Sequence, residues 1–161
     1  MATAKQDQEI VIQIANKFSG IDAPPSKIKK LVRTVLDRFG LSKATVSIAI
    51  VDDAEIRKLN SRFLNRKSNT DCLSFDLSDT REPQSPKLFE LIVNGEMAVR
   101  QADMRGHASQ AELALYITHG LLHNLGFDDA TDSKARKMHD MEDNILQQLG
   151  YGFVYNKNAK S

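Results

Sequence analysis

The stretch SQAELALYITHGLLHNLGFDD, residues 109–129, decides how this chain folds, because it encodes one long helix with almost no polar face. Ser109 to Glu112 has the spacing of a capping box, which starts a helix. Gly126 is suited to end it in the left-handed conformation. A helix that is apolar on nearly every side is buried inside a domain. The apolar positions are Leu113, Leu115, Tyr116, Ile117, Leu121, Leu122 and Leu125.

Short apolar or alternating runs on the N-terminal side of this helix, the first of them dominated by β-branched residues, predict strands. We expect strands at residues 9–15, 44–51, 72–77 and 88–93. Asn94–Gly95 predicts a turn or bulge, after which residues 96–99 are expected to continue the sheet before a short helix begins near Val99. Residues 78–87, with two prolines and several charges, predict a loop.

Three further helices are predicted by apolar residues at 3.6-residue spacing. One begins at Pro24–Pro25 and ends at Gly40, and a second is capped by Asp52 or Asp53. The last runs from about residue 132 to residue 149. Since strands and helices do not alternate strictly, the expected fold class is α+β: a small mixed β-sheet packed with helices, with a metal site on a central buried helix, in one domain over residues 1–161.

Composition is that of an ordinary globular protein. Of 161 residues, 41% are hydrophobic, and the single cysteine, Cys72, excludes an intrachain disulfide. Cys72 itself is expected to be a small core residue. No apolar run reaches the roughly 20 residues needed to span a bilayer, and the N-terminus has no secretory apolar block. These features predict a cytoplasmic protein that does not contact a membrane.

Charge is unevenly distributed although the net charge is only +1. Residues 21–67 hold eleven Lys and Arg against five Asp and Glu, whereas residues 111–150 hold three against seven. One interpretation is a phosphate-binding face beside a metal site. The alternative is that solvated helix faces are simply unequal, and composition does not decide between them.

His119 and His123 are the residues most indicative of chemistry. Residues at i and i+4 lie on the same helix face, so both imidazoles can reach one metal ion. Leaving both rings unpartnered in a buried helix would cost on the order of 1–3 kcal/mol each. Beyond the turn at Gly126, Asp129 is the candidate third ligand, and three protein ligands leave a fourth position for water.

Each of these assignments has an alternative. The two histidines could be core residues that bond backbone carbonyls, and Asp129 could instead cap the last helix, since Asp128, Thr131 and Asp132 compete for either role. His139 is expected to face solvent and His107 to lie in a loop. Zinc peptidases of the His-Glu-x-x-His kind carry a general-base glutamate where this chain has Gly120, which argues against peptide hydrolysis.

The residues HGLLHNLGFDD, 119–129, resemble a signature of the YbeY family of bacterial metallo-endoribonucleases, His-Gly-x-Leu-His-Leu-x-Gly-Tyr-Asp-His. The segment LNSRFLNRKSNTDCLSF, residues 59–75, is similar to that family's Leu-Asn-x-x-Tyr/Phe segment followed by Pro-Thr-Asp-Val-Leu-Ser-Phe. Gly95–Glu96 and the ending MEDNILQQLGYGF also resemble family features. The resemblance covers residues 46–153.

The resemblance implies an α+β fold, one zinc ion per chain and cleavage of single-stranded RNA. It also implies a role in maturing the 3′ end of 16S ribosomal RNA and in ribosome quality control, with the small ribosomal subunit as partner and no role for DNA. Three of the departures from the family pattern matter most for activity: Asp129 replaces its third histidine, Leu64 its arginine and Asn69 its proline. An anionic third ligand could favour a harder metal such as manganese.

The predicted function is therefore that of a metal-dependent endoribonuclease. The metal ligands are His119, His123 and Asp129, and Arg62 and Arg66 are the candidate catalytic residues that hold phosphates. The alternative for these arginines and Lys67 is a solvated polar loop. Two other functions remain open: a ribosome-binding assembly factor whose metal is structural or weakly held, and a metallohydrolase of another substrate.

Overall fold

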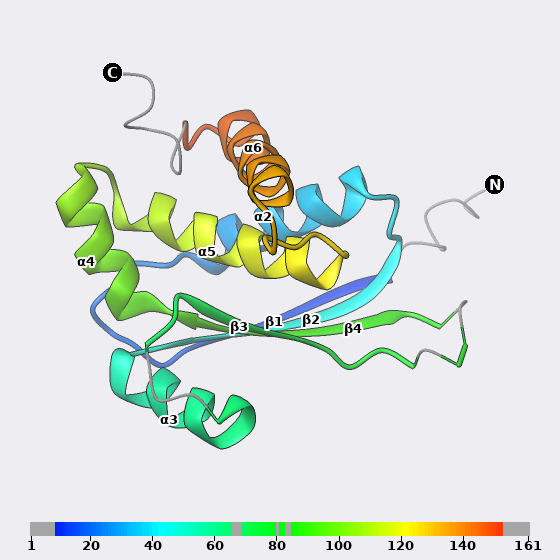
Figure 1. The fold of residues 1–161 in the computed structure, drawn as a ribbon, viewed down its shortest axis with the longest axis horizontal. Coiled ribbons are helices and arrows are strands. Elements are labelled where there is room, and N and C mark those ends of the chain that lie inside the picture. Colours follow the sequence, from blue (N-terminus) through cyan, green and yellow to red (C-terminus); the bar gives the residue numbers. More distant parts are fainter. Residues whose placement is uncertain (1–8, 66–68, 80, 83–84, 153–161) are drawn as a thin grey trace.

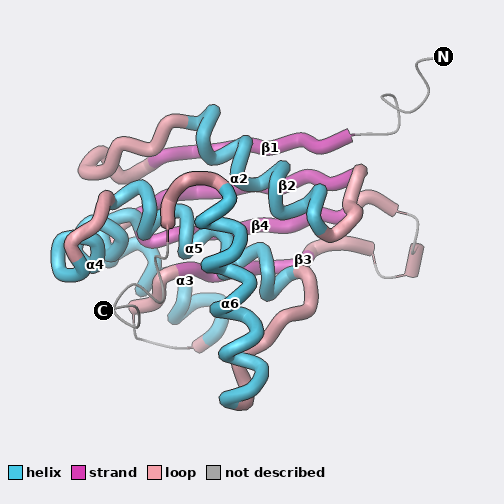
Figure 2. Tube along the Cα trace, turned by 90° about the horizontal axis from the view of Figure 1, so that it is seen from above, coloured by secondary structure: helices cyan, strands magenta, loops and turns pink. Residues whose placement is uncertain are grey.

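A four-stranded mixed sheet forms the base of the computed structural model, which describes residues 9–65, 69–79, 81–82 and 85–152. The strand order is β1-β2-β4-β3, with β1 (Glu9–Asn16), β2 (Lys43–Val51), β3 (Cys72–Asp76) and β4 (Lys87–Asn94). The pairs β1–β2 and β2–β4 are parallel, and β3 is antiparallel to β4. Figure 2 shows the strand order, with β1 and β3 at the two edges. All four strands lie, within one residue at each end, where the sequence predicts them.

Helices cover both faces of the sheet unequally (Figure 1). α2 (Pro25–Arg38), α5 (Ser109–Asn124) and α6 (Asp132–Gln148) lie over one face, and α3 (Asp53–Leu64) lies over the other. α5 contacts β3 and β4 as well as α2, α4 and α6, so it is the central helix of the domain. The α+β class and the central buried helix are confirmed. No helix in the described residues combines the length and the apolarity that crossing a membrane requires.

Gly120 sets how closely α5 packs on the sheet. A Cβ atom at this position would lie 2.8 Å from Cys72 Sγ and 2.9 Å from a Leu91 methyl carbon, closer than packed atoms approach. Glycine costs helix stability of about 1 kcal/mol relative to alanine, so its presence mid-helix calls for a packing reason. Close approach of the helix to β3 and β4 supplies that reason.

The segment after β4 differs from the prediction. Residues 96–99 do not continue the sheet, because α4 (Gly95–Arg105) begins directly after β4 and four residues before Val99. The Asn94 side chain accepts a hydrogen bond from the Met97 backbone N–H at 2.9 Å, so it caps the helix. Asn94–Gly95 therefore starts a helix here. Asparagine is common both in turns and at helix N-caps, so the Asn–Gly pair alone does not tell one from the other.

The predicted capping box at Ser109 is also wrong. The N-cap residue of α5 is Ala108, with no side-chain cap bond. The Glu112 carboxylate instead accepts from His107 Nε2 at 2.7 Å and from Arg105 Nη1 at 3.3 Å, while the residue is fully buried. The Glu112 carboxylate thus bonds to these two side chains and not to the backbone N–H at the start of the helix, as a capping box would require.

Candidate metal centre

His119 and His123 lie one turn apart on α5, and their Nε2 atoms are 3.1 Å from each other. The ring centroids are 4.6 Å apart with nearly perpendicular planes. Two nitrogens bound to one tetrahedral zinc at about 2.0–2.1 Å lie roughly 3.3 Å apart, close to the spacing seen here. The pair therefore has the separation that a shared metal ion requires.

The hydrogen bonds at the opposite ring nitrogens orient both imidazoles. His119 Nδ1 lies 2.5 Å from Glu142 Oε2, and His123 Nδ1 lies 3.1 Å from the Phe127 carbonyl oxygen. An ionised carboxylate and a carbonyl only accept, so each Nδ1 carries the proton and donates it. In the neutral ring the Nε2 lone pair is then free, which suits it to bind a metal.

Two lone pairs facing each other at 3.1 Å repel unless a cation or a proton lies between them. Burial disfavours the charged form of His119, but the hydrogen bond from its ring to Glu142 and the negative charges of Glu142, Asp71 and Asp129 outweigh it and raise the pKa of His119. These carboxylates surround the histidine with negative charge, so the site attracts positive charge.

Asp129 joins the histidines through the turn that follows α5. Gly126 has φ +103°, a conformation that favours glycine, and the Phe127 N–H bonds back to the Leu122 carbonyl at 2.9 Å. The structure brings His119, His123 and Asp129 together: each offers a ligand atom within 4.8 Å of the others. Imidazole nitrogens with one carboxylate are an acceptable ligand set for zinc.

The capping role considered for Asp129 belongs to other residues. The Thr131 hydroxyl oxygen accepts from the Lys134 N–H at 3.1 Å and caps α6. Asp128 accepts from the Ala130 N–H at 3.0 Å, and this bond is the main reason that its pKa is lowered. Because Asp128 and Thr131 hold the turn, the Asp129 carboxylate faces the histidines.

His139 does not face solvent as the sequence predicted. Its side chain is 18% exposed, its Nδ1 lies 2.8 Å from Glu142 Oε1, and its ring stacks on His119 at 6.3 Å between centroids. A second cluster of possible ligands, His119, His139 and Glu142, results from this arrangement. The sequence signal was present, since His139 and Glu142 are three residues apart on α6 and share a face.

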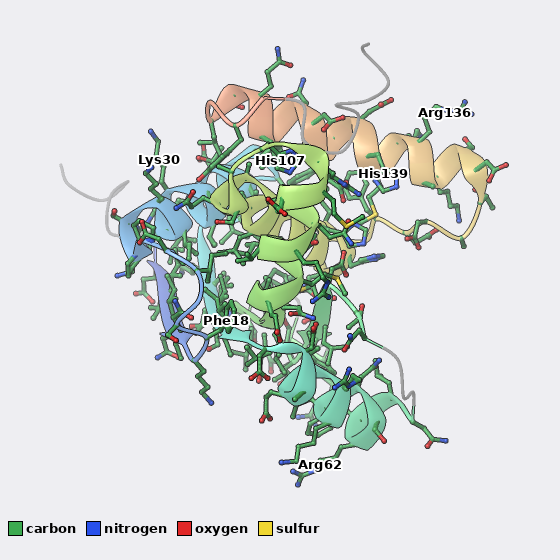
Figure 3. The ribbon with its side chains drawn as sticks, turned by 90° about the vertical axis from the view of Figure 1, so that its left-hand side faces the viewer. Phe18, Lys30, Arg62, His107, Arg136 and His139 are labelled. Atoms are coloured by element: carbon green, nitrogen blue, oxygen red, sulfur yellow. The ribbon has the colours of Figure 1, made fainter. Side chains whose placement is uncertain are left out.

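The structure does not bring Arg62 to the histidines. Arg62 lies on α3, across the sheet from α5, and its guanidinium carbon is 5.5 Å from the centre of the Phe63 ring. Figure 3 shows Arg62 and His139 well separated. Arg66 falls outside the described residues. Leu64, at the position matched to the family arginine, lines a cleft beside His123.

Two clefts are lined by the histidine pair. The first, about 580 Å³, lies along β3 and includes His123; the second, about 410 Å³, lies among α4, α5 and α6 and includes His119. Asn69 and Thr70 line both. The candidate metal centre therefore borders two spaces of the size that bind small ligands or single nucleotides.

The fold and the site define a class of protein: an α+β domain whose central helix carries a His-x-x-x-His pair with a carboxylate beside it. A family model described as "Endoribonuclease YbeY" matches residues 13–150. The chain belongs to the YbeY endoribonuclease family.

Individual relatives agree with the family model. An "Endoribonuclease YbeY" of Thermobifida fusca is 33% identical over 143 residues, covering 84% of this chain and 91% of that protein. Another from Finegoldia magna is 32% identical over 145 residues, covering 88% and 95%. A solution structure of TM1509 from Thermotoga maritima has a TM-score of 0.56 at 20% identity, covering 86% of this chain and 91% of that one, which supports the fold.

Proposed function

We propose that this protein is a metal-dependent endoribonuclease that cleaves single-stranded RNA at the centre formed by His119, His123 and Asp129. The observation that carries the proposal is the 3.1 Å approach of two Nε2 atoms whose rings are held by hydrogen bonds at Nδ1. The names of the relatives support RNA as the substrate. We propose Zn²⁺ as the ion, one per chain.

A bound zinc ion at this centre would polarise a phosphate oxygen and acidify a water molecule. The chain's own residues prepare the site. Glu142 and the Phe127 carbonyl fix the ring orientations, while Asp129 adds an anionic ligand atom. An anionic ligand in place of a neutral one reduces the acidity of bound water, so the ion held here is expected to be less activating than a three-histidine ion.

Phosphate binding by Arg62 and Arg66 stays a prediction. Because Arg62 lies across the sheet from the histidines, it could contact only RNA that extends past the end of α3. Such a contact would add salt-dependent affinity without touching the scissile bond. Arg62→Ala is therefore expected to weaken RNA binding at low salt and to leave the turnover number unchanged.

The direct test is cleavage of a labelled single-stranded RNA by purified protein, with and without added zinc and with a chelator. We expect cleavage that the chelator abolishes and zinc restores, and loss of both cleavage and bound zinc in His119→Ala and His123→Ala. Gln147→Leu, an exposed change at the far end of α6, is the control. Intact RNA after incubation with fully zinc-loaded protein would rule out the nuclease function.

We propose further that the RNA is the 3′ end of 16S ribosomal RNA, that the small ribosomal subunit is the partner and that the protein acts in the cytoplasm in ribosome quality control. Family membership supports this proposal. Depleted cells should accumulate 16S precursors with extended 3′ ends, and the protein should co-sediment with small subunits. If a folded His123→Ala variant co-sediments and restores processing, an assembly factor without nuclease activity is the better description.

A further inference from the structure

The first cleft lies along β3 beside His123. Among the described residues, its lining lacks the basic side chains that a phosphate-binding site usually has. Its described lining is apolar or neutral and polar apart from His123 and Asp76, and none of it is Lys or Arg. An acidic side chain without a basic partner repels phosphate.

A nucleobase has the opposite requirements to a phosphate. Its faces are apolar and its edge carries hydrogen-bond donors and acceptors. Leu64 and Leu73 supply an apolar surface in the first cleft, and the asparagine amides supply donors and acceptors. The volume of about 580 Å³ is ample for one base with its ribose.

Two of these amides have hydrogen-bonding capacity that the described residues do not use. Asn69 Oδ1 and Asn124 Nδ2 are shut off from solvent and have no hydrogen-bond partner within the part of the chain that the structure describes. An unsatisfied buried polar atom is unfavourable. Rotation about χ2 of asparagine is soft and exchanges the positions of the carbonyl and NH₂ ends, so both residues, which line the cleft, can present either end of the amide to a ligand there. A base edge, which carries both donors and acceptors, can bond to either end of such an amide.

Both residues also depart from the family signature, which has leucine at the position of Asn124 and proline at that of Asn69. The two departures meet on one cleft although they are far apart in the chain. Asn124 follows His123 directly, so a base bound by its amide would be adjacent to the metal centre.

We propose that Asn69 and Asn124 form a base-binding subsite, in which the first cleft takes up the base of the nucleotide next to the scissile phosphate. The inference rests on the proposed RNA substrate. A base held in the cleft fixes the position of its phosphate over His119 and His123, so the subsite positions the RNA and gives the enzyme a preference for a nucleotide whose base is unpaired. Paired bases cannot enter, because their edges are already occupied.

The test measures binding separately from cleavage. A fluorescein-labelled, phosphorothioate-linked single-stranded RNA, which resists hydrolysis, is titrated with purified protein, alongside an abasic ribose chain of equal length with the same linkages. We expect the wild type to bind the RNA at least about fivefold more tightly than the abasic chain. Asn124→Leu and, independently, Asn69→Ala should bring the two affinities within about twofold, and Gln147→Leu should change neither.

The binding measurement tests the base-binding subsite, and the cleavage assay tests the nuclease function. If the wild type binds both chains equally, or if both asparagine variants keep the full preference for bases while remaining folded by circular dichroism, the subsite is wrong, whether or not the protein cleaves RNA. If the base preference is present and lost in the variants but zinc-loaded protein leaves RNA intact, the subsite stands and the nuclease function fails.

Discussion

Glu142 Oε2 lies 2.5 Å from His119 Nδ1, and the Glu142 side chain is fully buried. The other oxygen of the same carboxylate lies 2.8 Å from His139 Nδ1. One acidic side chain on α6 thus holds two imidazoles, one of which belongs to the candidate metal centre. A carboxylate behind a metal-binding histidine fixes its orientation and raises its basicity.

Replacing Glu142 by glutamine tests this relationship. In Glu142→Gln the amide keeps the shape, but its NH₂ group would face one of two ring N–H donors, so one histidine must turn or change tautomer. We expect zinc affinity to fall by about 10- to 100-fold. The measurement is competition with a chromophoric chelator. Asp140→Asn, an exposed change on the same helix, is the control; equal affinities in both variants would contradict the positioning role.

Asp129 is predicted to set which metal the protein prefers. In Asp129→His the ligand set becomes three neutral imidazoles, which suit zinc better than manganese. We expect the ratio of zinc to manganese taken up from an equimolar mixture to rise by about tenfold, as read by elemental analysis. Asp129→Asn, which removes the charge without adding a ring, should lower the uptake of both metals. If the ratio is the same in wild type and Asp129→His, Asp129 does not contact the ion.

The sequence predicted those parts of the fold in which the spacing of apolar residues shows which side of a strand or helix is buried. The strand runs and the apolar helix at residues 109–124 were found because their patterns are local. The start of α4 was missed, since Asn94–Gly95 suits a turn and a helix start equally. The Asn94 side chain decides by accepting from Met97, which depends on the backbone position that the sheet imposes.

The candidate site was predicted only in its local part. His119, His123 and Asp129 lie within eleven residues of one another, so helix spacing and one glycine turn suffice to group them. Glu142 and His139 were not grouped with them, because their contact with His119 depends on how α6 crosses α5. The placement of Arg62 likewise follows from the sheet face on which α3 packs, which its own sequence does not specify.

Gly120 gives a prediction about stability. Alanine at an exposed helix position would stabilise the helix by about 1 kcal/mol relative to glycine. At Gly120 its Cβ would meet Cys72 Sγ at 2.8 Å, so we expect Gly120→Ala to lower the free energy of unfolding by about 1–3 kcal/mol. Urea denaturation measures the change. Adding Cys72→Ala should recover part of the loss, because the two side chains contact each other; a Gly120→Ala protein at least as stable as wild type would show that α5 does not pack this closely.

Asp53 gives a prediction about pH. Arg100 Nη1 donates to Asp53 Oδ2 at 2.8 Å and Asn94 Nδ2 donates to Asp53 Oδ1 at 2.8 Å, which ties the start of α3 to α4. The hydrogen bond from Arg100 is the largest cause of a lowered pKa at Asp53, and burial opposes it only in part. Because the folded pKa lies below the ordinary 3.8, the carboxylate stabilises the fold above that pH, and the contribution is lost as the pH falls through the folded pKa.

Asp53→Asn is therefore expected to lower the free energy of unfolding at neutral pH by about 0.5–1 kcal/mol, the range for a partly exposed ion pair. The difference from wild type should shrink toward zero below the folded pKa, where both proteins carry an uncharged group at this position. Urea denaturation at neutral pH and at a pH below the folded pKa, at one fixed salt concentration, measures the difference, because urea is uncharged and does not screen the ion pair. The matched control is Asp79→Asn, since the Asp79–Arg81 pair is far more exposed and should contribute little at either pH. A difference for Asp53→Asn that persists unchanged in acid would mean that the carboxylate acts through its shape and not through its charge.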